Sequence, residues 1–330
     1  MKFMSDLQVK APAEKITYND SIFLIGSCFT EHIGNRLAEL KFPVHQNPNG
    51  ILFDPISVCR SLNSYIQQQL YTTSDLFYYN ELWQSWHHHS IFSGMNADVV
   101  LEKINQSHFA AHTALQKATR IMITLGSAFT YHLKDGEEPV ANCHRAPGQW
   151  FNKQLSPIEK IVELLKETVE ALLTFNPSLT IIFTISPVRH LRDGLLENNR
   201  SKARLIEAAH QVVDTFTHCS YFPAYELVID VLRDYRFYDI DLAHPNYAAT
   251  EYVFSRLAEA YIAPETLVAM EEIKQVVTAC KHKPFQPDTA AHQRFLEGML
   301  AKTRVLQTQL PYLDFGAELR YFGGEGRHGA

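Results

Sequence analysis

Two residues that can act as nucleophiles, Ser27 and Cys28, stand between an apolar run and a segment with helical spacing; residues 25 to 30 read I-G-S-C-F-T. Gly26 permits a sharp turn from a strand into a helix. The first turn of a helix presents unpaired N–H groups and the positive end of the helix dipole, which stabilise a thiolate, an alkoxide or an oxyanion on a substrate. The stretch therefore predicts a nucleophile at a helix N-terminus.

A candidate acid–base pair, Asp241 and His244, lies three residues apart and is followed by Pro245, which we expect at the first position of a helix. This spacing lets the carboxylate hold the imidazole in one tautomer and stabilise the imidazolium formed during proton transfer. The alternative is a capping aspartate beside a surface histidine. We favour catalysis because the pair follows the last predicted strand, on the side of the sheet where Cys28 should emerge.

Five short apolar runs, rich in β-branched and aromatic residues, alternate with longer segments of helical spacing. This alternation is typical of βαβ units, which form a parallel sheet covered on both faces by helices. The predicted strands cover residues 22–25, 42–44, 121–125, 180–185 and 221–225. The clearest predicted helices between them cover residues 157–173 and 201–216.

Polar or small residues follow each predicted strand, where an open parallel sheet binds its ligands. Asn49 and Gly50 follow the second run, a Gly-Ser-Ala stretch from residue 126 follows the third, and Arg189 follows the fourth within S-P-V-R-H. Arg189 could bind a carboxylate or phosphate of a ligand, or form an ion pair with Asp193 or Glu226.

Three consecutive histidines, His87 to His89, raise the question of a metal site. Adjacent side chains do not point at one ion in a helix or a strand, and no pair of carboxylates accompanies them, so we expect no metal. His89 is the member we place in the pocket, with Trp86 and His144. The alternative is an aromatic loop that only covers an edge of the sheet.

The chain divides into an α/β part, residues 1–262, and a helical extension, residues 263–330. Residues 54–115 form an insertion in the first part, with one helix over residues 55–70. The extension contains two helices, broken at P-F-Q-P, and a glycine-rich tail at residues 323–326 that we expect to be disordered. Its helices would either close the pocket or form a homodimer.

Composition narrows the class of protein. The 330 residues carry a net charge of −6 with no basic run, which argues against nucleic-acid binding. The longest apolar run is strand-sized, so we expect no membrane span, and no secretory signal is evident. Five scattered cysteines without C-x-x-C spacing indicate reduced thiols in a cytoplasmic protein. No cofactor is implied.

Several motifs in one order resemble the GSCFA family, which belongs to the SGNH, or GDSL-like, hydrolase superfamily. The resemblance runs from about residue 18 to residue 262. It is carried by G-S-C-F-T, N-P-N-G-I-L-F-D-P, L-G-S-A-F, N-C-H, S-P-V-R-H, Y-F-P-A-Y-E and D-L-A-H-P-N. It implies a flavodoxin-like, three-layer α/β/α fold with a five-stranded parallel sheet, followed by the C-terminal helical extension.

The superfamily's first block, G-D-S-L-T, implies roles for the N-terminal motif. Cys28 occupies the position of the nucleophilic serine and Ser27 that of the aspartate; Ser27 is the alternative nucleophile if the turn is offset by one residue. A third interpretation is that Cys28 only packs under the helix. The resemblance further implies that Gly50 donates to the oxyanion, unless Asn49 and Gly50 simply form a turn.

A second oxyanion donor is less defined, because Gly126-Ser127-Ala128-Phe129 replaces the superfamily's G-x-N-D. Asn142, in N-C-H, could supply the amide, or it could be a buried polar loop residue.

The function that the resemblance implies is an acyl hydrolase or acyltransferase acting on a small-molecule ester or thioester, such as an O-acylated sugar. A non-catalytic ligand-binding module on a hydrolase-like scaffold is the main alternative. A third possibility is a phosphate-directed enzyme that uses Arg189 and the helix N-terminus.

Overall fold

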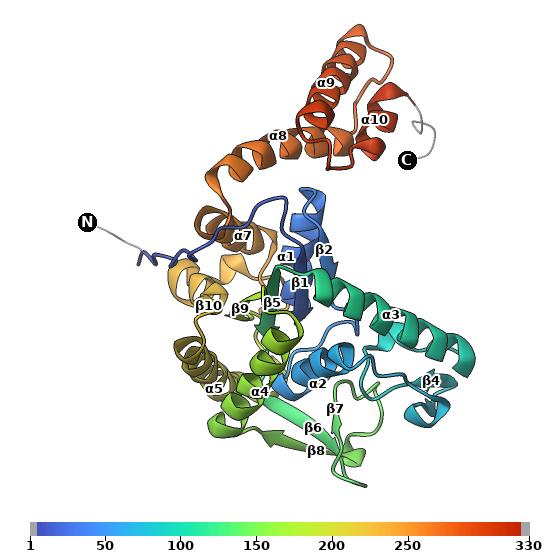
Figure 1. Cartoon of the computed structure of the whole chain (residues 1–330), viewed down its shortest axis with the longest axis vertical. Helices are drawn as coiled ribbons and strands as arrows, with labels where there is room; N and C mark the ends of the chain where they lie inside the picture. The colour runs from blue at the N-terminus through green and yellow to red at the C-terminus, as the bar shows by residue number, and fades with distance from the viewer. Residues whose placement is uncertain (1–4, 325–330) are drawn as a thin grey trace.

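The central sheet of the protein has five parallel strands in the order β2-β1-β5-β9-β10, as seen in a computed structural model that describes residues 5–324 (Figure 1). Counted along the chain, this is the flavodoxin-like order 2-1-3-4-5. The predicted α/β class and the five-stranded parallel sheet are therefore confirmed. The strand bounds are Ile22–Gly26 (β1), Val44–Gln46 (β2), Arg120–Leu125 (β5), Thr180–Ile185 (β9) and Cys219–Phe222 (β10).

The predicted bounds of the second and fifth strands were wrong. Phe42 stacks on Tyr18 with ring centroids 4.4 Å apart, and strand pairing begins only at Val44. At the other edge, β10 ends at Phe222, because Pro223 has no N–H to continue the ladder. The apolar residues at both places are real core residues, but they lie just outside the strands.

Helices cover both faces of the sheet. Alternate side chains of β1 point to opposite faces, with Ile22 and Leu24 in one core cluster and Phe23 and Ile25 in the other. The first cluster is covered by α1 (Cys28–Glu39) and α7 (Tyr247–Tyr261). The second is covered by α2 (Pro55–Ile66), α3 (Ala97–Lys117), α4 (Ile158–Phe175) and α5 (Gly194–Thr215).

Two small antiparallel sheets, which the sequence analysis did not predict, are added to this framework. The insertion contains a hairpin of β3 (Phe77–Tyr79) and β4 (Leu82–Gln84) ahead of α3. After β5 the chain forms a three-stranded sheet in the order β7-β6-β8, drawn in green at the bottom of Figure 1. Its strands are short and only half-buried, so they lack the apolar runs of the central sheet: β6 (Phe129–Leu133), β7 (Pro139–Val140) and β8 (Phe151–Leu155).

The C-terminal extension consists of three helices, one more than predicted: α8 (Pro264–Lys281), α9 (Ala290–Gln309) and α10 (Gly316–Gly323). They lie at the opposite end of Figure 1 from the β6–β8 sheet. Lys281 and Lys41 form ion pairs with Glu39 (2.6 Å) and Glu318 (2.7 Å), which attaches the extension at the C-terminal end of α1. Cys28 lies at the other end of this helix, about 16 Å away along its axis.

The extension therefore does not cover Cys28, and a homodimer through it stays a prediction. Within the predicted tail, Gly323 ends α10 and Gly324 caps it with φ +99°, whereas residues 325 and 326 lie outside the described residues. Along residues 5–324, no helix combines the length and the apolar character needed to cross a bilayer.

Candidate active site

The turn between β1 and α1 requires a glycine. Gly26 has φ +146°, and a Cβ on it would lie 2.2 Å from the carbonyl oxygen of Thr124 on β5. Its N–H donates to Asn47 Oδ1 (2.9 Å), and the N–H of Ser27 donates to the Thr124 carbonyl (3.2 Å). These bonds connect the ends of β1, β2 and β5, so that α1 begins at Cys28.

The two candidate nucleophiles differ in accessibility. Ser27 is buried, and its hydroxyl has no hydrogen-bond partner among the described residues. Cys28 is half-buried at the first position of α1. Burial raises the pKa of the Cys28 thiol, whereas the N–H of Phe29 at the helix start lowers it. Exposure thus favours Cys28 over Ser27.

The predicted pair of Asp241 and His244 forms in a tight turn. Asp241 Oδ2 lies 2.5 Å from His244 Nδ1, and Oδ1 accepts from the backbone N–H groups of Ala243 (2.9 Å) and His244 (3.0 Å). The N–H of His244, followed by its ring, lowers the pKa of Asp241 to about 2. Both side chains are roughly half-exposed. Pro245 is not the first helical residue, because Asn246 caps α7.

The Asp241–His244 turn lies at the end of β9. The Ala243 carbonyl accepts from the N–H of Arg189 (3.0 Å), which follows β9. Among the described residues, no hydrogen bond joins His244 to Ser27 or Cys28. The structure thus brings His244 and Asp241 together, and it places them at the same edge of the sheet as Cys28 without direct contact.

Two residues of this edge were missed in the sequence analysis. Lys202 on α5 is 1 % exposed, and its Nζ donates to the carbonyls of Gly126 and Ser186, which follow β5 and β9. Burial lowers the pKa of Lys202 to about 7. A signal existed: Lys202 precedes Leu205 by three residues, so it occupies the apolar stripe of a predicted helix.

His190 is the second missed residue. It lies against Gly126, where a Cβ would be 3.3 Å from His190 Nε2, and its ring contacts Phe53. Burial, followed by the charge of Lys202, lowers the pKa of His190 to about 4, so the imidazole is neutral at physiological pH.

Residues of the N-P-N-G turn form hydrogen bonds within the protein. The N–H of Gly50, where φ is +77°, donates to the Asn47 carbonyl (2.7 Å). The Asn49 side chain is buried and donates to Ser61 Oγ on α2 (3.0 Å). Gly50 therefore has no free N–H for an oxyanion in this structure, which agrees with the turn that was its alternative interpretation.

His89 lies over this turn. Its Cβ is 2.3 Å from the position of a Cβ on Gly50, so a side chain there would displace His89. Burial lowers the pKa of His89, and Glu31 in the first turn of α1 opposes this effect. His89 is therefore held against the N-P-N-G turn.

Asn142 and His144 hold a neighbouring loop. Asn142 Oδ1 accepts from the N–H of His144 (2.8 Å). The His144 ring is bonded to the Ser85 carbonyl through Nε2 (2.8 Å) and to Ser90 Oγ through Nδ1 (3.2 Å), and it contacts the ring of Trp86. These bonds give both residues a structural role in tying the histidine-rich loop to residues 141–146.

Arg189 makes neither of the ion pairs considered from the sequence. Its guanidinium stacks over Tyr238 (4.3 Å) and Tyr235 (5.3 Å) instead. The two acids have other partners: Asp193 pairs with Lys153, and Glu226 accepts from the hydroxyl of Tyr221. The cation–π contacts leave Arg189 beside the Asp241–His244 turn.

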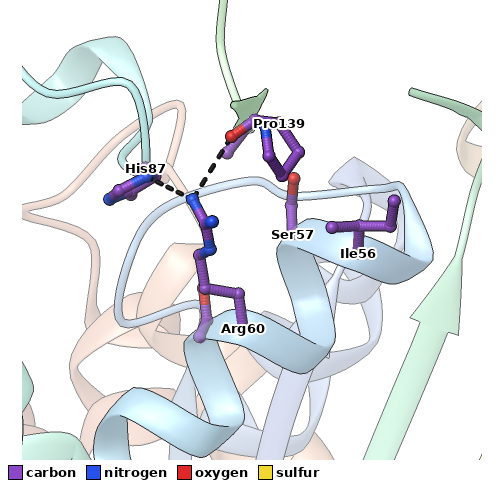
Figure 2. Close-up of a pocket in the computed structure, with 7 residues that line it drawn as sticks. Ile56, Ser57, Arg60, His87 and Pro139 are labelled. Atoms are coloured by element: carbon purple, nitrogen blue, oxygen red, sulfur yellow. Dashed lines mark hydrogen bonds between the residues drawn. The ribbon is translucent and has the colours of Figure 1, made fainter. Parts of the chain in front are cut away.

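The other two histidines of the triplet have separate partners. His87 contacts Arg60 and Glu138, whereas His88 Nε2 lies 3.0 Å from His108 Nε2 in the interior. Figure 2 shows Arg60 reaching His87 and the Pro139 carbonyl beside a cavity of about 10 Å³, room for roughly one water molecule.

Among residues 5–324, no three histidine, cysteine or acidic side chains are grouped to hold a metal ion.

Two family comparisons agree with the motifs found along the sequence. The GSCFA family matches residues 21–257, and the C-terminal domain of GSCFA domain proteins matches residues 273–325. A solved structure of a candidate platelet activating factor from Streptococcus pneumonia is 14% identical, with 73% of this chain and 83% of that chain covered and a TM-score of 0.36. No curated protein matches the chain.

Proposed function

Because the chain belongs to the GSCFA family, we propose that it is an acyl hydrolase or acyltransferase of the SGNH type, acting on a small ester or thioester such as an O-acylated sugar. The observation that supports this most strongly is the hydrogen-bonded pair of Asp241 and His244 at the sheet edge where Cys28 begins α1. A carboxylate-oriented imidazole at the same sheet edge as a thiol at a helix N-terminus is suited to acyl transfer.

In the proposed reaction, the Cys28 sulfur attacks the acyl carbon, and His244 serves as general base and then as general acid. Asp241 keeps the imidazole in one tautomer and stabilises its charged form. The first N–H groups of α1, at Cys28 and Phe29, would bind the oxyanion, because a helix leaves its first N–H groups unpaired. A direct bond between Cys28 and His244 is not required before substrate binds, since such bonds often tighten only in the complex.

The surface around the pair offers one cationic and several apolar groups to the proposed acylated ligand. Arg189 stands beside the turn and could contact a carboxylate or phosphate on the substrate. Ile240, Leu242 and Tyr247 are exposed next to His244 and offer apolar area for an acyl group.

Hydrolysis of short p-nitrophenyl esters tests the proposal. Cys28→Ala and His244→Ala should abolish turnover while the thermal unfolding temperature stays close to that of the wild type. Cys143→Ala, which removes another half-buried thiol outside the site, is the matched control and should retain full activity. Unchanged rates in both site variants would refute the proposal.

A binding module without chemistry is the second candidate. Two observations favour it. The N–H of Gly50 is already bonded to the Asn47 carbonyl, and no hydrogen bond joins Cys28 to His244 among the described residues. In that case Cys28→Ala would weaken or leave unchanged the binding of an acylated ligand, and the wild-type protein would turn over no ester.

A further inference from the structure

Lys202 is a lysine whose charged end lies in the interior of the protein, 1 % exposed. Its Nζ donates to the carbonyl oxygens of Gly126 and Ser186, each at 2.6 Å. These carbonyls directly follow Leu125 and Ile185, which are paired in register on β5 and β9. Burial of an ammonium group is unfavourable unless it is paired. Among the described residues no carboxylate pairs with Lys202.

The strand register brings Lys202 and Cys28 to the same edge of the sheet, where no hydrogen bond joins them among the described residues. Gly26 on β1 is paired with Thr124 on β5, so two residues further along each chain Cys28 and Gly126 leave the same edge of the sheet. Lys202 comes from α5 on one face, and α1 covers the other, so its side chain reaches across the strand ends. Burial lowers the pKa of Lys202, and a Cys28 thiolate opposes this; burial raises the pKa of Cys28, and the charge of Lys202 is among the effects that lower it.

The two carbonyl bonds leave one position on the lysine nitrogen uncommitted. An ammonium has three N–H donors, whereas a neutral amine has two N–H donors and a lone pair. Both carbonyls can therefore keep their donors in either state while the third position gains or loses a proton. Burial lowers the pKa of Lys202 to about 7, so a large fraction of the amine is neutral and able to accept a proton near neutral pH.

We propose that Lys202 is the proton acceptor of Cys28, which makes the two residues a lysine-activated thiol. This inference rests on the proposed role of Cys28 as the nucleophile, and it replaces His244 as the base of the first step only.

The proton balance is simple. The thiol proton moves to Lys202 Nζ as the bond from sulfur to the acyl carbon forms. The bond from the acyl carbon to the leaving oxygen then breaks, that oxygen takes up the proton from Lys202, and the amine is neutral again. His244 serves the second half, in which it accepts the proton of the water that hydrolyses the thioester and returns it to the sulfur.

Other titratable groups face this pair. Glu31 on α1 opposes ionisation of the Cys28 thiol. His190, after β9, has a pKa of about 4 and is neutral above pH 5. The ring of Tyr225 on α6 (Ala224–Glu226) lies 5.8 Å from Lys202 Nζ, and burial raises the pKa of its hydroxyl above 10. Between pH 5 and pH 9 neither His190 nor Tyr225 changes charge.

Alkylation of Cys28 by iodoacetamide between pH 5 and pH 10, followed by peptide mass spectrometry, tests the proposal without any substrate. In the wild type, the rate should rise in a step near pH 7, where Lys202 loses its proton. In Lys202→Met this step should disappear, and alkylation at pH 7.5 should slow about tenfold or more, because each unit of thiol pKa changes the thiolate fraction about tenfold. Alkylation of Cys143 in the same samples is the internal control.

His244→Ala is the matched variant and should leave the alkylation profile unchanged. A wild-type profile with no step near neutral pH, or the same profile in Lys202→Met, would overturn the inference, as would a step that disappears in His244→Ala. If Lys202→Met does not fold, Lys202→Gln takes its place, because the amide keeps two N–H donors and does not titrate. The wild-type profile tests the step near neutral pH without any variant.

The two proposals fail in different ways. If the proposed function is wrong, no ester is turned over, although the alkylation step and its dependence on Lys202 can persist. If only the role of Lys202 is wrong, turnover depends on Cys28 and His244, while the alkylation profile is independent of Lys202.

Discussion

His244 Nδ1 lies 2.5 Å from Asp241 Oδ2, and the same carboxylate accepts the backbone N–H of His244. The aspartate therefore holds both the backbone and the ring of the histidine. This leaves Nε2 as the ring nitrogen available to a substrate or a water molecule.

Asp241→Asn should lower kcat/KM for a p-nitrophenyl ester by about a hundredfold or more, because an amide does not stabilise the imidazolium or select the required tautomer. Asp241 has a pKa of about 2, so its carboxylate stays ionised above about pH 4, and a loss of activity between pH 7 and pH 4 must come from another group. Asp234→Asn, in another exposed turn where the side chain accepts from the N–H of Arg236, is the control and should retain activity. Equal activity of the two variants would contradict this role.

Gly26→Ala should destabilise the protein by about 3 kcal/mol or more. The cause is a Cβ placed 2.2 Å from the Thr124 carbonyl together with a φ of +146° that alanine rarely adopts. Gly148→Ala is the matched control: a Cβ there meets no atom within 4 Å, and the change should stay within about 0.5 kcal/mol. Urea unfolding measures both. Equal unfolding midpoints for the two variants would show that the strand-to-helix turn is not under this constraint.

The buried pair of His88 and His108 should make stability depend on pH. Burial lowers the pKa of His108 from 6.5 to about 4, so between these values the unfolded chain binds a proton that the folded protein excludes. The free energy of unfolding therefore has its full value above pH 6.5 and decreases as pH falls toward 4. Between pH 7 and pH 5, His108 alone should lower it by about 2 kcal/mol. His88 contributes in the same direction.

The free energy of unfolding in urea, measured at pH 7 and pH 5, checks this dependence. His108→Phe removes one titrating group and should reduce the difference between the two pH values. His282→Phe replaces a histidine on the surface of the C-terminal extension and should leave the difference unchanged. A pH dependence that is identical in His108→Phe and in the wild type would show that His108 is not buried in its neutral form.

The central sheet was largely predictable. Thr180–Ile185 was predicted with the bounds that β9 has, because all but the first of its residues are buried, and a fully buried strand forms a continuous apolar run. The bounds of the edge strands β2 and β10 were misplaced by two or three residues, because apolar residues just outside a strand also enter the core. The β6–β8 sheet was missed because half-buried short strands carry a weak pattern.

The local part of the site was predictable for a similar reason. Asp241 and His244 are three residues apart, so a single turn brings their side chains together. The partners of Arg189 were not predictable: neither expected ion pair forms, since the rings of Tyr235 and Tyr238, from a loop far along the chain, cover its guanidinium.

The sequence by itself determined the strand-to-helix turn at Gly26, the pairing of Asp241 with His244 and the alternation of strands with helices, because these depend on neighbouring residues and on hydrophobic periodicity. The tertiary structure decided which groups meet at the carboxyl edge of the sheet. Lys202 and Cys28 come to the same edge of the sheet only because α5 and α1 pack on opposite faces of strands whose last paired residues lie side by side. Residues so far apart in the chain leave no pattern of spacing, and the buried charge that couples them exists only after the core has excluded water.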